Sequence, residues 1–194
     1  REISPVTLPD GTVVSTDDGP RAGTVYEKIS ALNPVFRPNG TVTAGNACPL
    51  NDGAAAVVIM SDTKAKALGL TPLARVVATG VSGLSPEIMG LGPIEAVKNA
   101  LGYAKMSVSD IDLFEINEAF AVQVLGSARA LGIDEDKLNV SGGAIALGHP
   151  FGMTGARITA TLLNNLATHD KTFGVETMCV GGGQGMAMVV ERLS

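Results

Sequence analysis

The sequence predicts an α/β protein in which helices cover both faces of a mostly parallel sheet. Strand-like and helix-like patterns alternate from residue 54 to the C-terminus, which is typical of helices packed on such a sheet. Apolar residues make up 45% of the chain and charged residues only 17%, so we expect a well-buried core. The 24 glycines favour tight packing and a close approach of the backbone to a ligand.

The first predicted strand is AAAVVIM, residues 54–60, a continuous apolar run with the length of a strand buried on both faces. A helix then begins with Ser61 or Asp62 as its N-cap. A second buried strand is predicted over 74–83, and an amphipathic helix over 92–104. This segment therefore predicts β-α-β-α.

The second half of the chain continues the alternation. A strand over 110–117 precedes a helix over 118–132 that ends at a glycine. A short strand and a glycine-rich loop are predicted over 138–150, followed by a helix over 152–169. Residues 173–193 read as two strands around a GGGQ turn, which adds an antiparallel hairpin to the sheet.

Residues 1–45 differ from the remainder, residues 46–194. They hold half of the ten prolines and form a turn-rich stretch without a sustained period. We expect a loop-like or partial region here and place a domain boundary near residue 45. Since the chain begins at Arg1, we expect it to be a piece of a longer protein.

Composition argues against several classes of function. A net charge of −5, aromatic content of 4% and the lack of tryptophan argue against a nucleic-acid partner. There is no run of about 18 apolar residues, so we expect no membrane association. The two cysteines are far apart and form no ligand pair, which predicts a reduced, cytoplasmic protein without a structural metal.

His149 is the first candidate for chemistry, because it lies between Gly148 and Pro150 in the run GGAIALGHPFGMTGAR. An imidazole moves protons near neutral pH, and its glycine-rich surroundings let backbone and substrate approach closely. The helix that follows directs its positive end toward the loop, which favours a neutral base. A hydrogen-bonded loop histidine is the alternative, and the residues alone leave both open.

Cys179 and Asn117 are further candidates at strand ends. Cys179 precedes three glycines whose N–H groups can form an oxyanion site, so its thiol is either a nucleophile or proton carrier or a small buried hydrophobe. Asn117 either holds a water or carbonyl oxygen or caps a helix. Cys48 is expected to be structural, and Glu115 and Glu118 to be solvated or helix-start carboxylates.

Three segments in order, NEAFA, GGAIALGHPFGMTGAR and CVGGGQGMA, resemble the C-terminal half of a thiolase. The segments DGPRAGT, LNPVFRPNGTVTAGNACPLNDGAAA and MGLGPI extend the resemblance over essentially the whole chain. It implies a mixed five-stranded sheet with helices on both faces, the C-terminal half-domain of the thiolase fold. Residues 1–45 would then be a remnant of the thiolase loop domain, and 46–194 the C-terminal domain.

The resemblance implies reversible Claisen chemistry, in which coenzyme A cleaves a 3-ketoacyl-CoA. His149 would activate a nucleophilic cysteine, and Cys179 would move the proton at the α-carbon of acetyl-CoA. Asn117 would hold a water that stabilises the thioester enolate together with the histidine, and the N–H of Gly181 would donate to a second oxyanion hole. The nucleophilic cysteine belongs to the N-terminal half, so we expect this polypeptide alone to be inactive.

The resemblance also implies a coenzyme A surface, with coenzyme A as a substrate and no bound cofactor or metal. The residues at matching positions are Arg21 at the adenine nucleotide, Leu32, Phe36, Ala44 and Met89 along the adenine or pantetheine, Ala119 and Phe120 near the thioester, and Cys48, where biosynthetic enzymes often carry serine. The expected partners are coenzyme A and acyl-CoA, the N-terminal half of the same thiolase and, when complete, further copies in a dimer or tetramer.

Phe151 and Met153 after the histidine differ from the usual biosynthetic pattern. They predict a reshaped acyl pocket and a degradative role in lipid metabolism, in β-oxidation or steroid side-chain breakdown. The alternative to an enzyme is a non-catalytic acyl-CoA-binding or interaction module with the same fold. The combination of His149, Asn117 and Cys179 favours the enzyme, because a scaffold has no physical need for those three residues together.

Overall fold

A computed structural model describes residues 2–194. A four-stranded mixed sheet lies at its centre, in the strand order β3-β6-β5-β4. β4 and β5 are parallel, whereas the other neighbouring pairs are antiparallel. The strand bounds are Ala74–Gly83 for β3, Leu113–Ile116 for β4, Phe173–Val180 for β5 and Gln184–Arg192 for β6.

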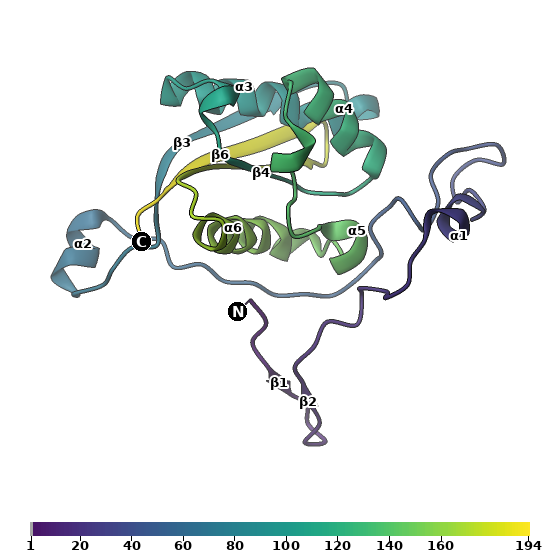
Figure 1. Cartoon of the computed structure of the whole chain (residues 1–194), viewed down its shortest axis with the longest axis horizontal. Coiled ribbons are helices and arrows are strands. Elements are labelled where there is room, and N and C mark those ends of the chain that lie inside the picture. Colours follow the sequence, from purple (N-terminus) through teal and green to yellow (C-terminus); the bar gives the residue numbers. More distant parts are fainter. Residues whose placement is uncertain (1) are drawn as a thin grey trace.

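Helices cover both faces of this sheet, as predicted (Figure 1). Helix α3, Gly92–Ala104, packs on β3, β5 and β6, and α4, Ala121–Leu131, lies beside it on the same side. Helix α6, Phe151–Thr168, packs on β4 and β5 from the other side, with the one-turn helix α5, Ala144–Leu147, next to it. The α/β class and the helices on both faces of a mixed sheet are therefore confirmed, whereas the expected mostly parallel pairing is wrong, because β4–β5 is parallel and both pairings of β6 are antiparallel.

Each face of the sheet has its own apolar core. The core under α3 and α4 is the larger and includes Val97, Phe114 and Val175, which are at most 1% exposed. The core under α6 is built from Leu113, Leu162, Leu166 and Val190. Alternation along β4 sends Phe114 to one core and Leu113 to the other, which explains why all four of its residues are buried.

Several predicted boundaries agree closely with the structure. β3 and α3 have the predicted bounds, and the hairpin of β5 and β6 turns at Gly181–Gly183. Helix α2, Asp62–Ala67, begins with Ser61 as its N-cap, whose hydroxyl accepts from Lys64 N at 3.1 Å. The helix before Gly132 ends there in a left-handed conformation, with φ of 69°.

Two predicted strands are wrong, and the expected fifth strand of the sheet is one of them. Residues 54–60 are extended but unpaired within the described chain, and Val58 and Ile59 are 86% and 78% exposed. A strand needs a hydrogen-bonding neighbour, and no described strand pairs with this segment. Residues 138–150 contain a single β-bridge, between Leu138 and Phe114, because Asn139 turns the chain with φ of 46°.

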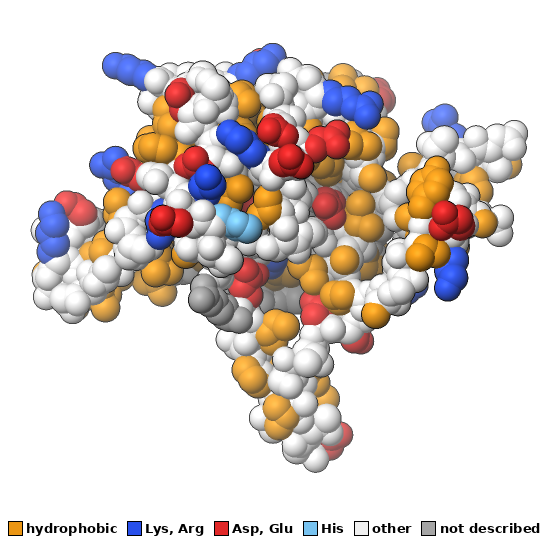
Figure 2. All heavy atoms as spheres, in the orientation of Figure 1, with side chains coloured by type: hydrophobic (Ala, Val, Ile, Leu, Met, Phe, Trp, Pro, Cys, Tyr) orange, Lys and Arg blue, Asp and Glu red, His pale blue; other side chains and the backbone are white. Residues whose placement is uncertain are grey.

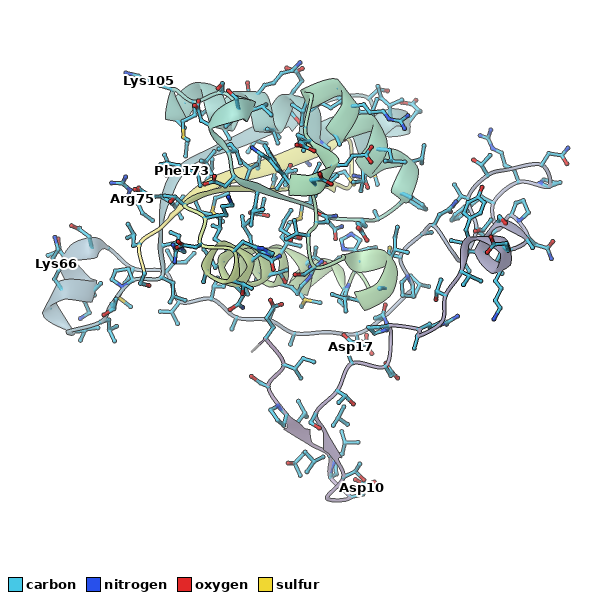
Figure 3. All side chains as sticks on the ribbon, in the orientation of Figure 1. Asp10, Asp17, Lys66, Arg75, Lys105 and Phe173 are labelled. Carbon is cyan, nitrogen blue, oxygen red and sulfur yellow. The ribbon has the colours of Figure 1, made fainter. Side chains whose placement is uncertain are left out.

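Residues 2–53 form an extended arm around the body of the molecule (Figure 1). It contains a short hairpin and one short helix, and almost all of its residues are exposed. Figure 2 shows hydrophobic side chains on the surface of this arm, and Figure 3 places Asp10 at the tip of the hairpin, far from the sheet. Its elements are β1 at Val6–Thr7, β2 at Val13–Val14 and α1 at Tyr26–Ser30. The proposed boundary at residue 45 stays a prediction.

Candidate active site

Asn117 and Cys179 lie at the same edge of the sheet. The backbone N–H of Asn117 donates to Thr177 O at 3.0 Å, directly after the parallel pairing of Ile116 with Thr177. Cys179 is two residues further along β5 and is 7% exposed. Because β4 and β5 are parallel, their carboxyl ends meet at this edge, where ligands bind in sheets of this kind.

Asn117 does not cap a helix, so that alternative is wrong. Helix α4 begins four residues later, and Phe120 occupies its N-cap position. The Asn117 side chain is 1% exposed, and neither Oδ1 nor Nδ2 has a hydrogen-bond partner among the described residues. A buried amide without a partner is costly, and such groups in native proteins call for an explanation such as a functional role or a bound water.

His149 lies two residues before α6, and its ring is anchored by that helix. Its Nδ1 is 2.7 Å from Thr154 Oγ1, and the Thr154 hydroxyl donates to Pro150 O at 3.0 Å. A hydroxyl has one proton to donate, so Oγ1 accepts from Nδ1–H and the second ring nitrogen, Nε2, carries the lone pair. The local chain thus holds the neutral imidazole in the tautomer of a base acting through Nε2.

The environment of His149 also disfavours the imidazolium. Burial lowers the pKa of His149, and the positive charge of Arg157 on α6 lowers it further. The partial positive charge at the N-terminus of α6 also disfavours the imidazolium. The expectation from the sequence, a neutral histidine in front of a helix, agrees with this geometry.

An open cavity of about 300 Å³ lies beside the histidine. The Phe151 ring flanks the imidazole at 4.9 Å between centroids and is 79% exposed. The residues that line the cavity are Leu50, Asn51, Asp52, His149, Pro150 and Phe151. The segment that follows Cys48 therefore forms one wall of the cavity and the histidine loop the other.

Cys48 is brought to the same edge by a short antiparallel contact. The Cys48 N–H donates to Ala119 O at 3.1 Å, and a bridge joins Ala47 to Phe120. Burial raises the pKa of both cysteine thiols, and the proximity of Cys48, whose thiolate would repel a second negative charge, raises that of Cys179 further. Cys48, Cys179, Ala119 and Phe120 therefore share one region, and both thiols are favoured in their protonated form.

The predicted coenzyme A residues are brought together only in part. The Phe36 ring meets Phe120 edge-on at 6.0 Å, and Leu32 lies against the backbone of Gly45, next to Ala44. Met89 is half-buried in the 3-10 turn Pro86–Leu91, which packs on α4. Arg21 is exposed on the arm, and Gly181 is exposed at the hairpin turn.

Glu115 is not solvated, which corrects the expectation from the sequence. It is 2% exposed on β4 and lies opposite Glu176 of β5 in the sheet register. Asn165 of α6 donates to its Oε1 at 3.0 Å. Burial raises the pKa of Glu115 to about 8 against the opposing effect of Arg157, and burial raises that of Glu176 to about 8 as well.

Sequence reasoning missed two residues that organise the site. Thr154 anchors the imidazole, and a hydroxyl residue one turn into the helix after a histidine was the available signal. Glu118 was expected at a helix start, yet its carboxylate accepts from Asn139 Nδ2 at 3.0 Å and from Ile145 N at 3.1 Å. It therefore joins the end of β4 to the loop that leads to the histidine.

Residues 2–194 contain no group of three or more potential metal-ligating side chains that could hold an ion. Among the described helices, none is long and apolar enough to cross a membrane.

Comparisons with known proteins show the family of the chain. The profile described as thiolase, C-terminal domain, matches residues 70–192, and that of the thiolase N-terminal domain matches residues 1–63. The chain belongs to the thiolase family. An acetyl-CoA acetyltransferase of Escherichia coli is 52% identical over 192 residues, which are 99% of this chain and 49% of the relative. A 3-ketoacyl-CoA thiolase of Bacillus subtilis is 51% identical over 92% of this chain and 46% of its own length.

Solved structures give the same result. The acetyl-CoA acetyltransferase of Bacillus anthracis superposes with a TM-score of 0.95 at 47% identity, over 98% of this chain and 49% of that one. Human mitochondrial 3-ketoacyl-CoA thiolase in complex with CoA gives a TM-score of 0.90 at 44% identity, over 97% and 48%. The thiolase fold of this chain is therefore confirmed, and the chain spans about half the length of the relatives it matches.

Proposed function

We propose that this chain carries the C-terminal catalytic half of a thiolase that acts on 3-ketoacyl-CoA. One observation carries the proposal: the hydrogen bond that joins His149 Nδ1 to Thr154 Oγ1 beside an open cavity, from which we infer that Nε2 acts as the base. The buried, unpartnered amide of Asn117 and the thiol of Cys179 at the neighbouring strand end support it. Relatives that match 99% and 92% of this chain are named acetyl-CoA acetyltransferase and 3-ketoacyl-CoA thiolase, respectively.

The proposed thiolysis has two half-reactions. A cysteine from polypeptide outside these 194 residues, deprotonated by His149, attacks the 3-keto carbon, and the bond between that carbon and the α-carbon breaks. The acyl group stays on the cysteine, and the departing enolate of acetyl-CoA takes a proton from Cys179. The thiol of coenzyme A then gives its proton to the Cys179 thiolate and attacks the acyl-cysteine. This releases the shortened acyl-CoA, and the departing cysteine thiolate recovers its proton from His149.

Charge on oxygen has to be stabilised in both steps. We assign the thioester enolate oxygen to His149 and a water held by Asn117, and the oxygen of the attacked keto group to the N–H of Gly181. The protonated state of Cys179 that burial favours matches its role as the acid in thiolysis. Arg21, Leu32, Phe36, Ala44, Cys48, Met89, Ala119 and Phe120 are proposed to contact coenzyme A, which binds as a substrate.

The acyl chain is proposed to be longer or bulkier than acetoacetyl. Phe151 is largely exposed beside the imidazole, so its ring is free to contact an acyl group in the cavity. This supports a degradative role in β-oxidation or in steroid side-chain breakdown. Thiolysis rates of the complete enzyme with acetoacetyl-CoA and with a long-chain 3-ketoacyl-CoA test it, and a strong preference for acetoacetyl-CoA would reject it.

A partner half is proposed to cover the exposed segment 54–60. Four large apolar residues lie there, Val57, Val58, Ile59 and Met60, with extended backbone that offers free hydrogen-bonding groups. Unpaired apolar strands of this kind add to the edge of another sheet. We propose that the N-terminal half of the thiolase provides that sheet, that the complete protein is a homo-oligomer, and that it is cytoplasmic.

Reconstitution tests the function. Denaturing mass spectrometry first establishes whether the purified chain is free of a second polypeptide. The chain alone is then expected to show no thiolysis, and addition of an N-terminal thiolase half that carries the reactive cysteine is expected to restore it. His149→Asn and Cys179→Ser should abolish the restored rate, whereas His169→Asn serves as a matched control for the histidine substitution.

The outcomes separate an enzyme from a binding module. A thiolysis rate from the pure chain would reject the proposed need for an external cysteine. Reconstituted protein that binds coenzyme A with no thiolysis would instead support the non-catalytic acyl-CoA-binding module.

A further inference from the structure

We propose that Glu118 is a positioning residue whose carboxylate holds the glycine-rich loop before His149 against the end of β4, next to Asn117. The inference rests on the proposed function, because it concerns the relative placement of two residues of that site. Asn117 and His149 come from different elements and lie far apart in the sequence. Their separation in the folded chain depends on how the intervening loop is fastened.

The carboxylate makes two hydrogen bonds to that loop. Its Oε1 accepts from Asn139 Nδ2 at 3.0 Å, and its Oε2 accepts from Ile145 N at 3.1 Å. Asn139 in turn bonds both backbone groups of Ile116, accepting from its N–H at 2.8 Å and donating to its carbonyl at 2.9 Å. The end of β4 is thus joined to the start and the end of the loop.

The bond to Ile145 is the one that reaches the histidine. Ile145 is the second residue of α5, and first-turn N–H groups of a helix have no partner within the helix. The Gly148 N–H bonds Ala144 O at 2.8 Å, so α5 connects Ile145 firmly to the residue before His149. A shift of Ile145 would therefore move Gly148 and His149 relative to Asn117.

Gly143 shows how tightly the loop fits this carboxylate. A Cβ atom at Gly143 would lie 2.4 Å from Glu118 Cδ, although the backbone φ of −158° suits any residue. A side chain there has to displace either Glu118 or the loop. In contrast, a Cβ atom at Gly152 in the first turn of α6 would meet nothing within 4 Å.

Two variants of the chain as it exists test the proposal. Glu118→Gln keeps the shape and replaces one acceptor by a donor, so one of the two bonds breaks. Gly143→Ala keeps the charge and displaces the carboxylate. Gly152→Ala is the matched control, and thermal melting confirms that each variant is folded.

The first readout is hydrogen exchange at the Ile145 amide. Hydrogen bonds to charged groups are strong, so displacing the carboxylate in Gly143→Ala converts to roughly 10- to 100-fold faster exchange at Ile145. Glu118→Gln leaves Ile145 at most a neutral amide acceptor and should act in the same direction, and Gly152→Ala should leave the rate as in wild type. If neither substitution folds, slow exchange at Ile145 in the wild-type chain supports the bond, and exchange as fast as in a free peptide overturns it.

The second readout is the NMR signals of the His149 ring, which a purely structural role would leave in place. The chain has two histidines, so His169 is an internal reference. The His149 signals should move in Glu118→Gln and in Gly143→Ala while those of His169 stay fixed. A shift in Gly143→Ala identifies position as the cause, because this variant retains the carboxylate charge.

Unchanged Ile145 exchange in both folded variants, or unchanged His149 signals in both, would overturn the proposal. Neither readout depends on turnover. A failed reconstitution therefore rejects the proposed function while the loop measurements still decide the role of Glu118.

Discussion

The hydroxyl of Thr154 decides which nitrogen of His149 acts as the base, and Thr154→Val tests this directly. The substitution preserves the shape of the side chain and removes Oγ1, which accepts from His149 Nδ1 and donates to Pro150 O. Pro150 O keeps two backbone donors, Met153 N at 2.9 Å and Thr154 N at 3.1 Å. The main consequence of the substitution is therefore that the imidazole loses its hydrogen bond.

The expected magnitudes follow from the burial of Thr154, which is 0% exposed. Removing a hydrogen-bonding hydroxyl at such a site costs about 2 kcal/mol, which lowers Tm by about 4–8 °C in a chain of this size. The Nδ1–H tautomer loses about 1 kcal/mol of this, so its ratio to the Nε2–H tautomer falls about fivefold.

Nitrogen NMR of the two histidines measures the tautomer ratio, and melting curves measure the stability. Thr154→Ser keeps the hydroxyl and should retain the wild-type tautomer ratio even if it lowers Tm through the lost methyl group. An unchanged ratio for His149 in Thr154→Val would refute the role of Thr154, whatever the change in Tm.

Three further predictions concern charge and packing around the same sheet. Arg157→Gln removes a positive charge that disfavours the imidazolium, so it should raise the pKa of His149 in an NMR titration; an unmoved pKa would contradict the assigned cause. Burial raises the pKa of Glu176 to about 8, so the native state keeps a proton that the unfolded chain releases near pH 4.3, and the stability from this proton is lost as the pH rises toward 8. Glu176→Gln should therefore raise Tm at pH 8 and flatten its dependence on pH between 5 and 8, and a profile parallel to wild type would speak against a buried neutral carboxyl. Gly92→Ala should destabilise by about 2 kcal/mol or more, because its Cβ would lie 2.4 Å from the backbone of β6, whereas Gly102→Ala in the same helix meets open space and should stabilise by about 0.5–1 kcal/mol in urea unfolding.

The elements with a clear local signal were predictable from the sequence. Helix α3 has a proline in its first turn and a regular apolar period, and its predicted bounds are those observed. The hairpin of β5 and β6 follows from two apolar runs around three glycines, two of which adopt positive φ. The site residues His149 and Cys179 were identifiable because glycine neighbours made them unusual.

The sequence did not predict contacts between side chains that lie far apart in the chain. Asn139 donates a hydrogen bond to Glu118, and the sequence around neither residue predicts that contact. Glu115 looked like a surface carboxylate because its burial depends on α6 folding over β4, which places Asn165 against it. Long-range pairs of this kind are fixed by topology, so local pattern does not reveal them.

The segment 54–60 shows how a failed prediction still carries information. The rule that a continuous apolar run forms a buried strand is a statement about free energy, since apolar surface in water is costly and unpaired backbone needs a partner when buried. Within the described chain the run stays extended and exposed at Val58 and Ile59, so the residues present satisfy neither requirement. The N-terminal thiolase profile covers this run, whereas the C-terminal profile begins after it. We propose that its apolar side chains contact a sheet of the N-terminal thiolase half, at the junction of the two halves and directly after Leu50, Asn51 and Asp52, which line the cavity beside His149.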